Sequence, residues 1–285
     1  MLRICSKQEY KQYVDFVYEI ALDPSKSGYP IYSDGIKTKD MFFSRSGRAF
    51  SRDTEAILLF EYEGIVEGWI HYYVLPEDKY ISTVSFNILF HTEEALREFL
   101  ELIHKQYKGY ELYLGYPMDN VKAVNYLSAH GFECIEKNYN TTAYLEKYKP
   151  EAADDSVVRI TKQNYEYFRL LHRSLESDMY WNSERIYIDI EHWIIFVKIK
   201  NGEAVGALYY MDAADAWYEI FGIDMKDNRV NGEIYRELLV KALTAAKEMG
   251  GKYMTYFCDE EELEIVSGLG FECVGCHVCY KKLII

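Results

Sequence analysis

The five residues GFECI at positions 131–135 return almost unchanged as GFECV at positions 270–274. A second appearance of the same short stretch is the mark of a duplicated structural unit. Between the two lies YKPEAADDS, residues 148–156, which contains a proline, small residues and acids and is typical of a linker. The sequence therefore predicts two copies of one fold, with domains at residues 1–149 and 150–285.

Two further anchors repeat in the same order and show where the copies differ in length. GIVEGWIHYY from Gly64 returns as GEAVGALYY from Gly202, and RICSKQEY from Arg3 returns as RITKQNY from Arg159. The offsets are 138 residues for the glycine anchor and 156 for the arginine anchor, so the first copy carries 18 extra residues. These fall between its first helix and first hairpin, in the polar stretch at residues 23–52.

Each copy predicts the element order β-α-β-β-β-α-β-α-β-β. Ser6 and Glu9 form a capping box before a helix in the first copy. In the second, Asn201-Gly202 predicts a tight hairpin, and Gly250-Gly251 ends a long helix. A helix that connects two strands of one sheet predicts a parallel pair. The fold class is therefore α/β, with a mixed (α+β) sheet.

The charge and composition exclude several classes of protein. The net charge of −14 argues against nucleic acid or an anionic membrane as the main partner, because both need clustered lysines and arginines. The first residues lack the apolar core of a signal peptide, and no run approaches the length of a membrane span. These features predict a cytoplasmic protein whose six cysteines are thiols.

One motif points elsewhere. Cys273-Val-Gly-Cys276-His277 spells the attachment signal of a c-type haem, and with Cys279 it offers four ligands for zinc. The first copy continues as GFECIEKNYN, without the second cysteine or the histidine. Side chains alternate along a strand, so Cys273 and Cys276 point to opposite faces unless Gly275 forms a bulge. We expect neither a metal nor haem.

The element order, with Gly-Phe after the last helix, resembles the GNAT (GCN5-related N-acetyltransferase) superfamily, and the duplication is similar to its tandem members. The first copy carries the family's late-helix pattern at Asn120, Ala123, Val124 and Gly131-Phe132. The second copy matches only at Gly270-Phe271 and has Asp259 in place of the asparagine. The resemblance implies two acyl-CoA N-acyltransferase domains. It also implies acetyl-CoA as co-substrate and direct transfer to an amine in a ternary complex.

The family's acetyl-CoA loop, [QR]-x-x-G-x-[GA], is matched in part by RVNGEI at residues 229–234. Arg229 and Gly232 fit, whereas Ile234 stands where a small residue belongs. Free N–H groups at a helix N-terminus attract a pyrophosphate. By resemblance, the cofactor-binding residues are Phe221, Gly222, Ile223, Arg229, Val230, Asn231, Gly232, Glu233 and Ile234.

The first copy has His91, Thr92, Glu93 and Glu94 in the corresponding place. Two carboxylates at a helix N-terminus satisfy the dipole and repel a pyrophosphate. The N-terminal domain is therefore predicted to be degenerate and not to bind CoA.

Three residues are candidates for the chemistry of acyl transfer. Glu219, in the middle of the predicted strand 217–223, can relay the proton of the amine through water or can lie on a solvated strand face. The position of the family's tyrosine acid holds Leu127 in one copy and Val266 in the other. Tyr256 and Cys258 are substitutes at a strand end, where packing is the plainer interpretation.

The sequence thus predicts an N-acetyltransferase acting on an amine of a small molecule or peptide, as a monomer or homodimer. The alternative is a catalytically impaired CoA- or ligand-binding protein of the same fold. Tyr180, Trp181, Tyr187 and Trp193 cluster where the family closes over the acceptor, and they either form an acceptor pocket or join the two halves.

Overall fold

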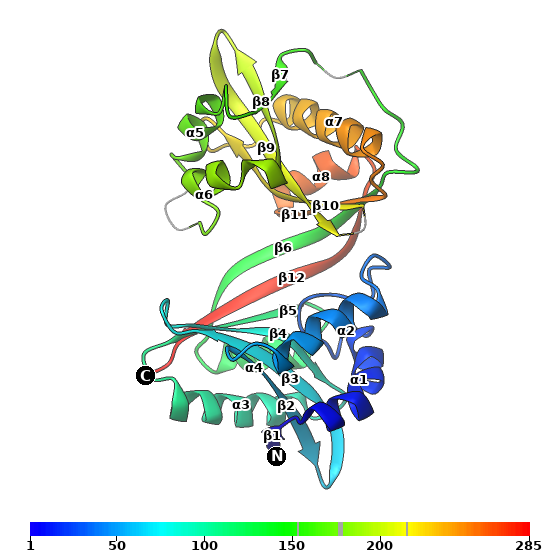
Figure 1. The fold of residues 1–285 in the computed structure, drawn as a ribbon, viewed down its shortest axis with the longest axis vertical. Coiled ribbons are helices and arrows are strands. Elements are labelled where there is room, and N and C mark those ends of the chain that lie inside the picture. Colours follow the sequence, from blue (N-terminus) through cyan, green and yellow to red (C-terminus); the bar gives the residue numbers. More distant parts are fainter. Residues whose placement is uncertain (153, 176–178, 215) are drawn as a thin grey trace. The chain divides into compact units, whose positions relative to one another are not determined.

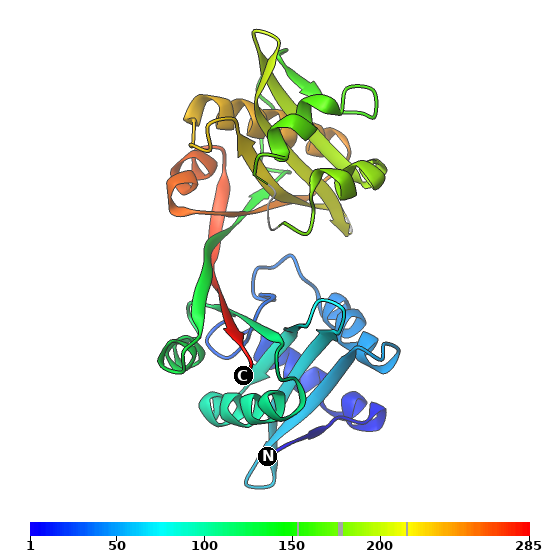
Figure 2. The same cartoon turned by 90° about the vertical axis from the view of Figure 1, so that its left-hand side faces the viewer.

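The computed structural model describes residues 1–152, 154–175, 179–214 and 216–285, and these form two compact units (Figures 1 and 2). Unit 1 consists of Met1–Asn138 and Gly275–Ile285, and unit 2 consists of Tyr139–Val274. The predicted division at 149/150 differs from this one because the last strand of each copy belongs to two units. Residue 153, within the predicted linker, lies outside the described residues.

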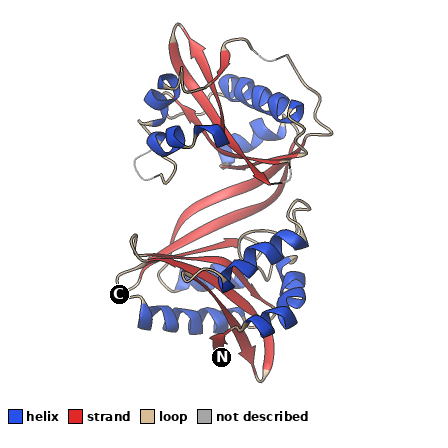
Figure 3. Ribbon diagram, viewed as in Figure 1, coloured by secondary structure: helices blue, strands red, loops and turns tan. Residues whose placement is uncertain are grey.

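Those last strands are β6, Glu133–Tyr144, and β12, Phe271–Leu283 (Figure 3). Tyr139–Tyr144 of β6 pair with β11 in unit 2, and His277–Leu283 of β12 pair with β5 in unit 1. Each copy therefore supplies the final strand segment to the sheet of the other unit. The two closing strands predicted for the tail are one continuous strand. Gly275 does not interrupt it, and the stretch lacks a turn sequence.

Unit 1 has the sheet order β1-β2-β3-β4-β5-β12. Its strands are antiparallel neighbours except for the parallel pair β4–β5. The strands complete within it are β1 Leu2–Ile4, β2 Glu55–Tyr62, β3 Ile65–Leu75, β4 Tyr80–Ile88 and β5 Glu111–Pro117. Its helices are α1 Lys7–Ala21, α2 Lys39–Gly47, η1 Arg48–Phe50, α3 Thr92–Gln106 and α4 Val121–Ala129.

Unit 2 repeats this plan, in the order β6-β11-β10-β9-β8-β7, with the parallel pair β10–β11. Its other strands are β7 Val157–Arg159, β8 Trp193–Lys200, β9 Glu203–Ala214, β10 Trp217–Met225 and β11 Tyr253–Cys258. Its helices are α5 Glu166–His172, α6 Ser183–Ile188, η2 Ile190–His192, α7 Gly232–Glu248 and α8 Glu260–Ser267. The predicted mixed α/β fold with its parallel pair is confirmed.

Alternation along the strands places a separate apolar core on each face of each sheet. In unit 1, Leu58 and Phe60 pack with α3 and α4, whereas Ile57 and Leu59 pack with α1 and α2. Figure 2 shows the two helix pairs on opposite sides of this sheet. In unit 2 the corresponding layers are α7 with α8, and α5 with α6. Because helices cover both faces of each sheet, the central strands and their ends are held in place by packing.

Local signals act as expected. The capping box of Ser6 and Glu9 is present at the start of α1. Asn201 and Gly202 both adopt positive φ, which suits the tight turn between β8 and β9. Residues 23–52, the stretch to which the 18 extra residues are assigned, contain α2 and η1, and the second copy has α6 and η2 between its first helix and β8. Among the described residues, none of the helices is long and apolar enough to cross a membrane.

His277, from the Cys-x-x-Cys-His motif, is buried in unit 1 and stacks on Tyr29. Burial lowers the pKa of its imidazole from 6.5 to about 4. The unfolded chain therefore takes up a proton below about pH 6.5 that the folded chain takes up only near pH 4. We expect the free energy of unfolding to fall as the pH drops from 6.5 to 4, by roughly 2–3 kcal/mol from this residue.

Urea unfolding at a series of pH values tests this, with His277→Phe showing a correspondingly flatter profile than the wild type. The exposed His130, stacked on Tyr126, gives a matched control in His130→Phe. Equal profiles for His277→Phe and wild type would contradict the expectation.

Candidate acyl-CoA site

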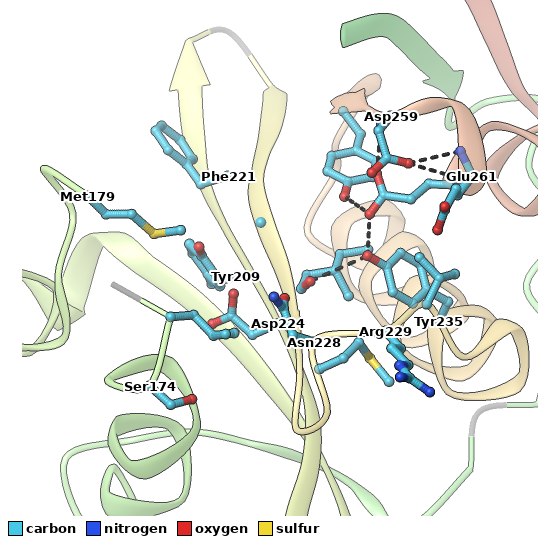
Figure 4. A pocket seen from close by; sticks show the side chains of 17 residues that line it. Ser174, Met179, Tyr209, Phe221, Asp224, Asn228, Arg229, Tyr235, Asp259 and Glu261 are labelled. Atoms are coloured by element: carbon cyan, nitrogen blue, oxygen red, sulfur yellow. Dashed lines mark hydrogen bonds between the residues drawn. The ribbon is translucent and has the colours of Figure 1, made fainter. Parts of the chain in front are cut away.

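A cavity of about 910 Å³ opens in unit 2 where β10 and β11 diverge (Figure 4). The parallel ladder between them ends at Ile220 and Tyr256, and β10 has a bulge at Phe221. A Cβ on Gly222 would lie 2.3 Å from the hydroxyl oxygen of Tyr209, so glycine is needed for this ring to lie against the strand. The cavity is thus a wedge between two strands, and we call it the unit 2 wedge.

The unit 2 wedge reaches the N-terminus of α7. Arg229 and Val230 line it, and they also line a neighbouring cavity of about 660 Å³. Lys200 and Lys226 lie in that second lining. Asn231 caps α7, its side chain accepting the Ile234 N–H at 3.2 Å. Cations around an exposed helix N-terminus provide a site for a phosphate group.

The structure brings most of the predicted cofactor residues together. Those lining the unit 2 wedge are Phe221, Gly222, Ile223, Arg229 and Val230. Asn231 and Ile234 line the neighbouring cavity, whereas Gly232 and Glu233 form the first turn of α7 outside both linings.

A buried aspartate on the other side of the wedge is paired with a histidine behind the cavity wall. Asp224 lines the cavity while only 6% exposed, and its Oδ2 lies 2.6 Å from Nδ1 of the fully buried His172. Nε2 of His172 lies 2.9 Å from the carbonyl oxygen of Trp181. Both ring nitrogens of His172 thus have an oxygen atom within hydrogen-bond distance. His172 thereby ties β10 to the segment before α6.

Tyr256, a predicted catalytic residue, lines the wedge beside Glu262. Its hydroxyl donates to Glu262 Oε1 at 2.9 Å, and Tyr235 donates to the same oxygen. Burial, then the neighbouring Tyr235 and Glu262, raise the pKa of Tyr256 well above 10. The phenol therefore keeps its proton at neutral pH, which is the state of a general acid.

The two other predicted catalytic residues lie outside the cavity lining. Glu219 sits within the ladder, in register with Met211 on β9 and Thr255 on β11. Cys258 ends β11 in the apolar core, and burial raises its pKa to about 12. It stays a thiol, as packing requires.

Sequence reasoning missed Asp224, His172, Tyr209 and Glu262. Asp224 follows the predicted strand directly, yet its partner lies 52 residues away, and no local pattern joins them. Glu262 reads as part of an acidic capping box, which it also forms with Asp259. Among the described residues there is no group of three or more His, Cys, Asp or Glu side chains placed to hold a metal ion.

No family model and no curated protein sequence matches this chain. Solved structures do. A GCN5-related N-acetyltransferase from Sphaerobacter thermophilus superposes with a TM-score of 0.67 at 12% identity, covering 100% of this chain and 95% of its own. A second match is a fungal multi-domain GH3 β-N-acetylglucosaminidase that has a GCN5-related glucosamine N-acetyltransferase region. It superposes with a TM-score of 0.65 at 12% sequence identity, and the match covers 99% of this chain and 38% of the fungal chain.

A tandem GNAT protein from the clavulanic acid biosynthesis pathway gives a TM-score of 0.59 at 11% identity, covering 100% of this chain and 98% of its own. The chain therefore has the fold of an acyltransferase class. More narrowly, this is the fold of the GNAT N-acetyltransferases, built here as two units.

Proposed function

We propose that this protein transfers an acetyl group from acetyl-CoA to an amine of a small molecule or peptide, in the cytoplasm. The observation that carries the proposal is the unit 2 wedge. It joins the N-terminus of α7 beside Arg229, which we assign to the pyrophosphate, to a space beside the diverging strands, which we assign to the pantetheine arm. Ser174 and Leu175, which follow α5, and Met179, which precedes α6, line the same cavity, and we place the acceptor there beside the donor.

In the proposed reaction the neutral amine attacks the thioester carbonyl carbon, the C–S bond breaks, and CoA leaves as the thiol. The ladder between β10 and β11 ends at Ile220, and we propose that N–H groups of β10 beyond this point polarise the carbonyl. Glu219 takes the proton of the amine through water. Tyr256 gives the thiolate its hydroxyl proton, which it donates to Glu262 Oε1 in this structure, and regains a proton from solvent.

The alternative, a CoA-binding protein without activity, is supported by particular residues. Leu127 and Val266 occupy the position of the family's tyrosine acid. Glu219 lies outside the lining of the wedge. A free-thiol release assay with acetyl-CoA over a panel of amines separates the two functions. Thiol release that depends on an added amine supports the enzyme, and binding without release supports the alternative.

Arg229→Glu should weaken acetyl-CoA binding roughly 10- to 100-fold, because a charge-assisted contact is replaced by repulsion. Isothermal titration calorimetry measures this. In a thermal shift experiment, acetyl-CoA at about 100 times its Kd should stabilise the wild type by about 2.7 kcal/mol.

Lys11→Glu makes the same charge change on the exposed face of α1 in unit 1 and serves as the control. It should bind acetyl-CoA as the wild type does. If the wild type itself shows no shift at millimolar acetyl-CoA, both CoA-based functions are wrong.

A further inference from the structure

Unit 1 builds the same wedge as unit 2 but fills it with its own chain. β4 and β5 pair only over Tyr80–Ser82 and Glu111–Tyr113 and then diverge, as β10 and β11 do. The segment Lys26–Tyr29 lies between the diverging ends, and we call it the unit 1 plug. It comes from the polar stretch in which the first copy is longer than the second.

The unit 1 plug bonds to both strands through its backbone. Ile88 on β4 donates its N–H to the Lys26 carbonyl at 3.1 Å, and Tyr29 donates its N–H to the Gly115 carbonyl on β5 at 3.0 Å. Asn120, which caps α4, donates from Nδ2 to the Ser27 carbonyl at 3.1 Å. The plug thus takes up backbone groups that the divergence of the strands leaves without a ladder.

The fit of the plug is close. Ser27 is fully buried. A Cβ on Gly28 would lie 3.1 Å from the Phe86 nitrogen and 3.3 Å from the Gly115 oxygen, so the backbone itself fills the space. Tyr29 then packs on His277 from the last strand segment. Little room is left between β4 and β5 beside the plug.

The N-terminus of α3, which corresponds to that of α7 in unit 2, is also occupied by a side chain of unit 1. The carboxylate of Glu67, only 6% exposed, accepts the His91 N–H at 3.2 Å just before α3 and contacts His91 Nδ1 at 2.9 Å. In unit 2 the position preceding the matching glycine is Val205, which lines the cavity of about 660 Å³. A carboxylate therefore stands in unit 1 where unit 2 has Val205 and a cavity, whose lining includes Lys200, Lys226, Arg229 and Asp227.

We propose that the unit 1 plug and Glu67 are internal substitutes for the two halves of acyl-CoA, the pantetheine arm and the pyrophosphate. A pantetheine arm is an extended chain with two amide groups, so a peptide segment can make the same hydrogen bonds. Unit 1 is then complete without a ligand and takes no acyl-CoA. This inference rests on the proposed function of unit 2, and it predicts that the chain binds one equivalent of acyl-CoA.

Calorimetry with acetyl-CoA and hydrogen exchange read by mass spectrometry test this on the full chain. We expect one equivalent, new protection confined to β10, β11 and the start of α7, and slow exchange of the Ile88 and Tyr29 amides before any ligand is added. Two equivalents, or new protection at Ile88, would overturn the plug and leave the transferase standing. Absence of binding overturns the proposed function alone. In that case slow exchange of the Ile88 and Tyr29 amides supports the plug, and fast exchange of these amides overturns it.

Gly28→Ala adds a direct test, because the new methyl group presses on backbone that has little freedom to move. The amides of Ile88 and Tyr29 should exchange roughly tenfold faster or more. The Kd for acetyl-CoA should stay within about twofold. Gly47→Ala is the matched control, since its nearest neighbour, the Tyr10 hydroxyl, is 3.8 Å away. Equal exchange in the two variants would overturn the proposal.

Discussion

Replacing Asp224 by alanine should lower the free energy of unfolding of unit 2 by about 1–3 kcal/mol, because it leaves Nδ1 of the buried His172 without its carboxylate partner. This is a large share of the stability of a typical domain, about 5–15 kcal/mol. The same change should abolish acyl transfer, since Asp224 lines the wedge and fixes Trp181 through His172. Urea unfolding and the thiol-release assay measure the two effects.

The chain offers a matched control for this substitution. Asp189 and His192 form a pair with the same 2.6 Å separation on the surface, where the histidine side chain is 75% exposed. Exposed pairs contribute about 0–1 kcal/mol, so Asp189→Ala should unfold almost as the wild type does. A similar loss in the two variants would show that burial is not what makes the Asp224–His172 pair matter.

Gly68→Ala should destabilise unit 1 by about 3 kcal/mol or more, and it should reduce the yield of folded protein. Gly68 has φ of 149°, and a Cβ there would lie 1.9 Å from the Asn87 carbonyl oxygen on the neighbouring strand. Neither backbone segment can move without breaking the pairing of β3 with β4. Urea unfolding, with tryptophan fluorescence as the signal, measures the loss.

Gly64→Ala separates the steric clash from the cost of positive φ. Gly64 has φ of 83°, but a Cβ there meets nothing within 4 Å. Its replacement should cost only about 1–2 kcal/mol. If Gly68→Ala proves no worse than Gly64→Ala, the contact with Asn87 is not the reason for glycine at this position.

Gly68 and Gly206 match in the sequence repeat but are glycines for different structural reasons. The sequence pairs it with Gly206, yet Gly206 is not among the glycines with positive φ. A Cβ on Gly206 would meet side chains of α7, 2.8 Å from Ile234 Cγ2. Glycine is required at position 68 by the close approach of the neighbouring strand, and at position 206 by the packing of α7 on the sheet. Only the neighbours of each glycine distinguish these reasons.

The sequence by itself determined the duplication, the order of elements, the parallel pair and the first caps and turns. These depend on residues close together in the chain, whose periodicity and turn chemistry act locally. It also placed the start of α7 and Arg229 before it, because a helix N-terminus has its own local pattern. Most of the predicted cofactor residues consequently line one of the two adjoining cavities.

The tertiary structure decided which segments meet. Nothing in GFEC assigns the strand after it to the sheet of the other unit, because alternation specifies a strand's faces but not its partner. The pairing of His172 with Asp224 and the filling of the first wedge by Lys26–Tyr29 join residues far apart in sequence. Such contacts follow from packing of whole elements. The same fold therefore has an open wedge in one unit and a filled wedge in the other.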